Sequence, residues 1–215
     1  MSIQVFYHMY CVNNYIERFL NTYNKIVKAE LINTCKNINI TIIGENQTAV
    51  CSSQIKDLEK VKTTYPTTSS IGETDTLRAI YQHCQNNPND KILYLHSKGA
   101  TRGANLNVQA WVDYMEYFLI EKYDKCLQKL KNYDTVGVEY SELPKQHYSG
   151  NFWWANASYI NTLRPFETGL QTSIINNPRW YCEFWLLDNI CNPCSLHQSC
   201  VDLYATEYKE HNYKL

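Results

Sequence analysis

Hydrophobic residues along this chain follow two patterns, one typical of buried strands and one typical of amphipathic helices. Short apolar runs closed by polar residues or glycine predict strands. Apolar positions at steps of three and four residues predict helices. The predicted strands span residues 3–9, 38–44, 91–95, 134–138 and 147–155. The predicted helices span residues 13–30, 74–84, 107–131, 156–163 and 180–187, and a shorter helix is expected within 54–65.

Predicted strands and helices alternate along the chain, which is typical of an α/β fold with a mixed, mostly parallel sheet flanked by helices. No internal repeat and no linker divides residues 1–215, so we expect a single domain. Residues 165–178 hold two prolines and one glycine, which predict a loop. The residues after 187 are rich in Cys, His and Tyr and are predicted to be irregular.

The composition narrows the class of protein. The chain has 215 residues, of which 44 % are hydrophobic, and a formal net charge of −1. These values are typical of a globular domain, and no basic stripe points to nucleic acid. No run reaches the roughly 18 apolar residues of a membrane span, and the N-terminus resembles a strand rather than a signal peptide. The nine cysteines are an odd count, mostly scattered, which fits reduced thiols and a cytoplasmic protein.

The most informative segment is the predicted strand 91–95 with the polar residues that follow it. The strand runs directly into His96, Ser97 and Lys98. Ligands of open α/β sheets lie beyond the carboxyl ends of strands, so we expect these side chains at a binding crevice. Lys98 is then either a contact to phosphate or a solvated loop charge, and Arg102 is a second cation with the same alternatives. His96 either hydrogen-bonds a ligand or is a satisfied structural histidine.

Two helices carry candidate carboxylates. Glu73, Asp75 and Arg78 begin the helix before strand 91–95, where they either bind hydroxyl groups or cap the helix and complement its dipole. Glu183 has aromatic neighbours in the sequence, and burial among them would raise its pKa toward that of a general base. The alternative for Glu183 is an ion pair with Arg179 one helical turn away.

Cysteines and a histidine recur near the C-terminus at steps of three residues. Cys191, Cys194, His197 and Cys200 could bind zinc, but structural zinc sites usually join two separated pairs of ligands. Free thiols or an incidental disulfide are the alternative that we favour.

Two sequence blocks resemble a known family. The blocks are Tyr94–Gly99 and His147–Ile160. With the order of the predicted elements, they resemble a family of small GT-A-type glycosyltransferases found in bacteria and large DNA viruses. The resemblance implies a GT-A-like domain over nearly the whole chain, with a nucleotide-binding half at about 1–100 and an acceptor half at about 101–215. It implies transfer of a sugar from a nucleoside-diphosphate sugar to a glycan or small-molecule acceptor, in the host cytoplasm if the protein is viral.

GT-A enzymes hold a divalent metal with an Asp-x-Asp motif, and this chain departs from that motif. His96 and Lys98 stand at the two acidic positions. The resemblance therefore implies catalysis without a cofactor, in which the Lys98 ammonium replaces the metal; manganese or magnesium is the alternative. In this interpretation Glu183 is the catalytic base, with Asp188 in reserve.

The resemblance also implies the remaining site residues. The expected donor-binding residues are Glu73, Asp75, Arg78, His96, Ser97, Lys98, Arg102, Ser149, Gly150, Asn151 and His197. The expected acceptor-binding residues are Trp153, Trp154, Trp180, Trp185 and Asp188. Trp153 and Trp154 point to opposite faces of a strand, so at least one of these two is expected to pack in the core instead. Because Asp-x-Asp is missing, two other functions stay open. One is a catalytically degenerate module that binds nucleotide sugars or glycans, and the other is an accessory protein that works with another enzyme.

Overall fold

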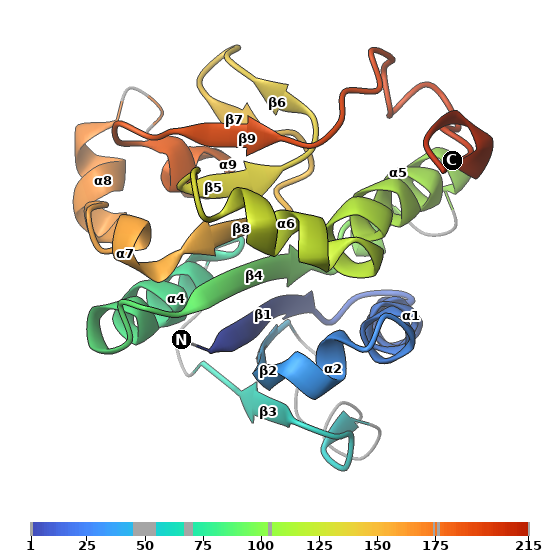
Figure 1. Cartoon of the computed structure of the whole chain (residues 1–215), viewed down its shortest axis with the longest axis horizontal. Coiled ribbons are helices and arrows are strands. Elements are labelled where there is room, and N and C mark those ends of the chain that lie inside the picture. Colours follow the sequence, from blue (N-terminus) through green and yellow to red (C-terminus); the bar gives the residue numbers. More distant parts are fainter. Residues whose placement is uncertain are drawn as a thin grey trace.

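A computed structural model describes residues 2–44, 55–66, 71–102, 105–173, 175 and 177–214 (Figure 1). Its centre is a seven-stranded sheet in the order β3-β2-β1-β4-β8-β5-β9. In chain order these strands are β1 (Ile3–Tyr10), β2 (Cys35–Ile43), β3 (Val61–Thr64), β4 (Lys91–His96), β5 (Thr135–Gly137), β8 (Trp153–Asn156) and β9 (Pro193–Ser195). A separate two-stranded sheet pairs β6 (Tyr140–Ser141) with β7 (His147–Tyr148).

The pairing confirms a mixed, mostly parallel sheet. Strand β1 is parallel to both β2 and β4, β2 is parallel to β3, and β5 is parallel to β9. Only β8 is antiparallel to its neighbours, β4 and β5. The chain moves outward from β1 to β2 and β3 and then returns to the other side of β1 to form β4. This reversal creates a crevice between the carboxyl ends of β1 and β4, where α/β proteins bind ligands.

Helices cover both faces of the sheet (Figure 1). One hydrophobic cluster packs one face against α1 (Tyr15–Lys28), α2 (Leu31–Thr34), α5 (Leu106–Glu116), the π-helix η2 (Tyr117–Glu121) and α6 (Tyr123–Lys129). A second cluster packs the other face against α4 (Thr74–Asn86), α7 (Ala157–Ile160), α8 (Phe166–Thr172), α9 (Pro178–Phe184) and the 3-10 helix η3 (Trp185–Leu187). Two further 3-10 helices are η1 (Ala100–Arg102) and η4 (Glu210–Asn212).

Several predicted elements differ from the structure. The predicted strand 147–155 is divided between β7 and β8, which belong to different sheets, and the segment after residue 187, predicted to be irregular, contains β9. The predicted helix 107–131 is interrupted by η2, where the Trp154 indole N–H donates to the Leu119 carbonyl at 2.8 Å. The predicted loop 165–178 is wrong, because it contains α8. Its prolines stand at helix starts, where a missing N–H costs little: Pro165 at the N-cap of α8 and Pro178 at the first residue of α9.

Three tryptophans predicted to bind an acceptor are instead core residues. Trp153 and Trp154 lie on opposite faces of β8 and are 1 % and 0 % exposed, and Trp185 is 1 % exposed. The Trp185 indole donates to the Arg164 carbonyl at 3.2 Å. Aromatic rings of this size dominate core packing, so the prediction of acceptor contact is wrong for these three residues.

Within the described ranges, no helix is both long enough and apolar enough to span a membrane.

Candidate functional site

A cavity of about 500 Å³ opens at the carboxyl ends of β1 and β4. Its walls come from strand ends, the start of α4, α9 and the C-terminal segment. The lining residues are His8, Tyr10, Ile43, Ile71, Gly72, Glu73, His96, Ser97, Lys98, Gly99, Ala100, Thr101, Val108, Arg179, Glu183 and Tyr204. Of the residues predicted from the sequence, the cavity brings together Glu73, His96, Ser97, Lys98 and Glu183.

Strand β4 enters the cavity through a well-connected segment. The Ser97 N–H donates to the His8 carbonyl and the Ser97 hydroxyl accepts from the Tyr10 N–H, both at 2.9 Å. Ser97 therefore joins the ends of β1 and β4, and its hydroxyl is already engaged. The His96 Nε2 lies 2.9 Å from the Gly150 carbonyl, an acceptor, so Nε2 carries the hydrogen. Burial, together with nearby Lys98, lowers the pKa of His96 to about 3, which keeps the ring neutral.

The Lys98 ammonium lies against aromatic rings at the edge of the cavity. Its Nζ is 3.9 Å from the centroid of the buried Trp111 ring and 5.7 Å from that of Tyr204. Cation–π contacts of this kind contribute about 0.5–2 kcal/mol. The next residue, Gly99, has a φ of +75°, and a Cβ there would lie 2.3 Å from a Val108 methyl carbon. The backbone is therefore confined, and Lys98 is not a freely solvated loop charge.

Glu73 occupies the N-cap position of α4, and its carboxyl group faces the cavity. Asp75 therefore does not cap this helix, and the Glu73 side chain makes no capping hydrogen bond. That side chain is only 17 % exposed, and its Oε1 lies 3.8 Å from the His96 Nδ1. Burial and the nearby charge of Glu183 raise the pKa of Glu73 to about 7, although Lys98 and a hydrogen bond with Cys182 oppose the shift.

Helix α9 presents Arg179 and Glu183 to the cavity. The Asn177 side chain caps this helix by accepting from the N–H groups of Arg179 and Trp180. The aromatic side chains of Tyr181 and Phe184 turn into the core, whereas Glu183 is exposed. The expectation that aromatic neighbours bury Glu183 is therefore wrong. Glu73 is a lining residue whose carboxyl group does have a pKa raised by burial. In the described part of the chain, Arg179 and Glu183 do not form an ion pair.

Eleven lining residues were not among the predicted site residues, and three of them are His8, Arg179 and Tyr204. His8 lies near the end of β1, where its Nδ1 is 2.9 Å from the Thr76 hydroxyl and burial lowers its pKa to about 3. Strand alternation could have indicated His8, because it shares the α4 face with the buried Phe6. Arg179 was considered only as a partner of Glu183. No sequence pattern indicates Tyr204 as a site residue, because its position depends on how the C-terminal segment packs on α5. The Asn107 side chain of α5 donates a hydrogen bond to the Tyr204 carbonyl.

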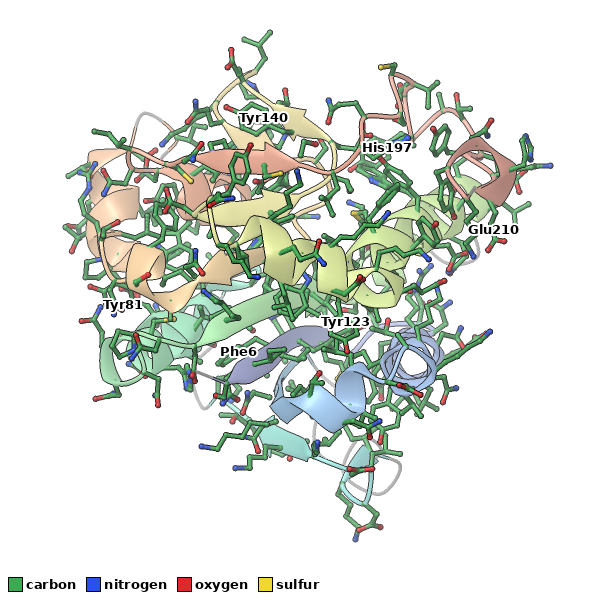
Figure 2. All side chains as sticks on the ribbon, in the orientation of Figure 1. Phe6, Tyr81, Tyr123, Tyr140, His197 and Glu210 are labelled. Carbon is green, nitrogen blue, oxygen red and sulfur yellow. The ribbon has the colours of Figure 1, made fainter. Side chains whose placement is uncertain are left out.

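Several predicted donor-binding residues lie outside the cavity lining. Asp75 forms an ion pair with Arg78, which also pairs with Glu167 on the surface. His197 lies near the C-terminal segment, where Nδ1 is 2.9 Å from the Tyr114 hydroxyl (Figure 2). For these three predicted residues, the structure does not support contact with a ligand in the cavity.

The block around residue 150 supports the cavity from behind. The Ser149 hydroxyl lies 3.3 Å from the His147 Nε2, and the Asn151 amide donates to the Cys182 carbonyl at 3.3 Å. Gly150 contributes only its carbonyl, to His96. None of these three predicted donor residues lines the cavity: Gly150 is hydrogen-bonded to β4, Asn151 to α9, and Ser149 contacts His147 of β7.

Asp188 and Trp180 also lie outside the lining. The Asp188 carboxylate accepts from the Tyr181 hydroxyl at 2.6 Å and pairs with Lys145. Trp180 is 62 % exposed beside Arg179 and does not line the cavity. Arg102 ends η1, and its side chain lies outside the described residues.

The side chains at the end of β4 do not suit a divalent cation. A metal would meet the Lys98 ammonium and a His96 ring whose Nε2 donates to a carbonyl. Among the residues described, no three His, Cys, Asp or Glu side chains gather in a group that could hold a metal, and this includes Cys191, Cys194, His197 and Cys200. Cys191 instead contacts the Thr135 hydroxyl at 3.5 Å.

Fold and cavity together define an α/β protein with a polar ligand site at the switch point of its sheet. Residues 6–181 match the model of a family described as a domain of unknown function, DUF8361. This match spans most of the sequence, so the chain belongs to the DUF8361 family. No curated protein matches it.

Two solved structures resemble the chain at low identity. One is a protein from Desulfovibrio desulfuricans G20 proposed to be a nucleotide-diphospho-sugar transferase, with 10 % identity, a TM-score of 0.43 and coverage of 92 % of this chain and 81 % of that one. The other is a 4-diphosphocytidyl-2C-methyl-D-erythritol synthase, with 11 % identity, a TM-score of 0.40 and coverage of 90 % and 88 %. Because both TM-scores are below 0.5, an argument about function has to come from the cavity itself.

Proposed function

We propose that this chain is a glycosyltransferase that moves a sugar from a nucleoside-diphosphate sugar to a hydroxyl group of a glycan or small molecule. One observation carries the proposal: Lys98, Glu73 and Glu183 line the same cavity at the switch point of the sheet, and Lys98 is close enough to Glu73 to affect its pKa. A cation can bind a diphosphate, and a carboxylate can accept the proton of an attacking hydroxyl.

In the proposed reaction, the bond between the anomeric carbon and the diphosphate oxygen breaks and negative charge develops on the leaving diphosphate. Lys98 and Arg179 are the cavity cations that would stabilise this charge. One ammonium at about 4 Å contributes roughly 4 kcal/mol at an effective dielectric constant near 20. Because Trp111 and Tyr204 already hold the Lys98 side chain, little side-chain entropy is lost when the phosphate binds.

Glu183 is the proposed base. It is exposed on α9 at the side of the cavity that an acceptor hydroxyl can reach, and it is close enough to Glu73 to affect its pKa. The attacking oxygen bonds to the anomeric carbon while its proton passes to the Glu183 carboxylate. General base catalysis of this kind contributes about 10²–10⁴-fold. Trp180, exposed on the same helix, is the remaining aromatic candidate for stacking on an acceptor sugar.

A ligand screen tests the proposal. We expect one nucleoside diphosphate, and the corresponding nucleotide sugars, to raise the melting temperature, with or without manganese. An enzyme should also hydrolyse its sugar donor slowly when no acceptor is present. Binding without hydrolysis or transfer would favour the alternative of a degenerate binding module, and no shift with any nucleotide would contradict the proposal.

A further inference from the structure

The cavity contains an unusual carboxyl group that the proposed transfer reaction does not use directly. Glu73 lies between His96, Lys98 and Glu183, and its side chain is largely buried. Other titratable and charged groups around the cavity come from four elements. They are His8 on β1, Tyr94, His96 and Lys98 at the end of β4, Arg179, Cys182 and Glu183 on α9, and the paired Asp75 and Arg78 on α4.

The hydrogen bonds around His96 indicate the state of Glu73. Because the His96 Nε2–H donates to the Gly150 carbonyl in a neutral ring, the Nδ1 atom carries a lone pair. That lone pair faces the Glu73 Oε1 at 3.8 Å. A carboxylate would face it with like partial charge, whereas a protonated carboxyl group presents an O–H donor. At 3.8 Å the two atoms do not form a hydrogen bond, so His96 offers a Glu73 carboxylate no donor and its lone pair disfavours the negative charge, whereas the hydrogen bond with Cys182 favours that charge.

Charge in the cavity favours the protonated state of Glu73 once an anion enters. Lys98 is the cation that now opposes the rise in the Glu73 pKa. A bound diphosphate would neutralise the field of Lys98 and add negative charge of its own, and Glu183 is already an acidic neighbour. An extra like charge about 6 Å away contributes roughly 3 kcal/mol at an effective dielectric constant near 20, equivalent to about 2 pKa units.

We propose that Glu73 takes up a proton when the anionic donor binds, and that it then donates a hydrogen bond to an oxygen of the ligand. The inference rests on the proposed function, because it needs a diphosphate in this cavity. In this role Glu73 donates a hydrogen bond to the ligand, whereas an ionised carboxylate would accept hydrogen bonds from sugar hydroxyls. Because the proton that Glu73 takes up comes from the buffer, the affinity for the donor should fall as the pH rises above neutrality.

The remaining groups do not supply this proton near pH 8. Burial lowers the pKa values of His8 and His96 to about 3, too far from pH 8 for a bound anion to protonate them. Burial raises the pKa of Tyr94 and of Cys182, so both are already protonated. The phosphate groups of a nucleoside diphosphate are fully ionised at this pH.

Calorimetry with ADP, CDP, GDP and UDP at pH 8.0, in two buffers that differ in ionisation enthalpy, measures proton uptake directly. For the diphosphate that binds, we expect about 0.8 proton taken up per ligand, and a dissociation constant that rises about sixfold per pH unit around pH 8. Glu73→Gln mimics the protonated state and should bind with no uptake and no such pH dependence. Glu167→Gln, a surface carboxylate, is the matched control and should behave as the wild type.

Binding by the wild type without proton uptake at pH 8.0 would overturn the inference and leave the proposed function intact. Uptake that persists in Glu73→Gln would also overturn it. The pH dependence of wild-type affinity provides the same test if Glu73→Gln does not fold. Failure of all four diphosphates to bind would overturn the proposed function, and this inference with it.

Discussion

The two sides of the cavity are built differently. At the end of β4, each side chain is held: Ser97 joins β1, His96 is bonded to Gly150, and Lys98 rests on Trp111. On α9, Arg179 and Glu183 are exposed, and no ion pair joins them in the described structure. Under the proposed function, the preorganised β4 side would bind the diphosphate, with Arg179 as a second cation from α9, and Glu183 on α9 would act on the acceptor.

Glu183→Gln should cause the largest change, because it removes the proposed base and keeps the size and polarity of the side chain. We expect transfer to fall at least about a hundredfold while donor affinity is kept, which is the pattern of a group that acts mainly in the transition state. Glu167→Gln should have no effect on either quantity. Equal loss of donor affinity would instead show that both sides of the cavity bind the donor, and near-normal transfer would remove Glu183 as the base.

Lys98→Met should act on binding rather than on chemistry alone. It keeps the apolar stem over Trp111 and removes the charge, so we expect diphosphate affinity to fall by about 1.5–3 kcal/mol, or about 10- to 150-fold, the range for a hydrogen bond to a charged group. Titration calorimetry measures the change. Lys122→Met is the matched control, since the Lys122 ammonium also lies over an aromatic ring, 5.4 Å from the centroid of Tyr117. If the two variants bind equally well, the β4 side does not bind the diphosphate.

Glu73→Gln should change how stability depends on pH. Burial and the nearby Glu183 raise the pKa of Glu73 from 4.5 to about 7, so the folded protein keeps a proton that the unfolded chain releases between these values. The stabilisation is present below about pH 4.5 and is lost as the pH rises to 7, by up to roughly 3 kcal/mol. Urea unfolding from pH 4.5 to 7.5 should therefore show the wild type losing stability relative to Glu73→Gln.

His8 and His96 change the stability with pH in the direction opposite to Glu73. The lowered pKa values of His8 and His96 remove stability as the pH falls below 6.5, because the unfolded chain then binds protons that the folded rings do not. Both histidines are present in wild type and variant, so their effect largely cancels in the difference. A difference between the two proteins that stays constant with pH would show that the folded state does not favour a proton on Glu73.

Two glycines allow a smaller test of the rigidity of the β4 side. Gly99 and Gly72 both have positive φ values, +75° and +60°. A Cβ at Gly99 would clash with Val108, whereas the nearest atoms to a Cβ at Gly72 lie at 3.5 Å. Gly99→Ala should therefore cost about 2 kcal/mol or more in unfolding free energy and weaken diphosphate binding, and Gly72→Ala only about 1 kcal/mol. Equal costs would mean that the β4 side is no more confined than the side near α9.

The same contrast explains what the sequence could predict. The change from an apolar run to His96, Ser97 and Lys98 is a local signal, so strand β4 and its polar end were found directly. Glu73 and Glu183 become neighbours only when α4 and α9 pack on the same face of the sheet, and periodicity in one segment does not report such a contact. Residues adjacent in the sequence of a helix point in different directions, so the aromatic neighbours of Glu183 do not bury it. Helix α9 turns Tyr181 and Phe184 inward and leaves Glu183 outside. The sequence also does not show that both faces of β8 are covered by helices, which is why Trp153 and Trp154 are core residues rather than acceptor contacts.

The most direct test is titration of the protein with its nucleoside diphosphate in the presence of EDTA, alone and with an excess of manganese. If Lys98 takes the place of the metal, the dissociation constant should be the same within about twofold in both conditions, and Lys98→Met should weaken binding in both. Binding that EDTA abolishes and manganese restores would contradict this account, and Glu73 and Glu183 would then be the ligands to examine.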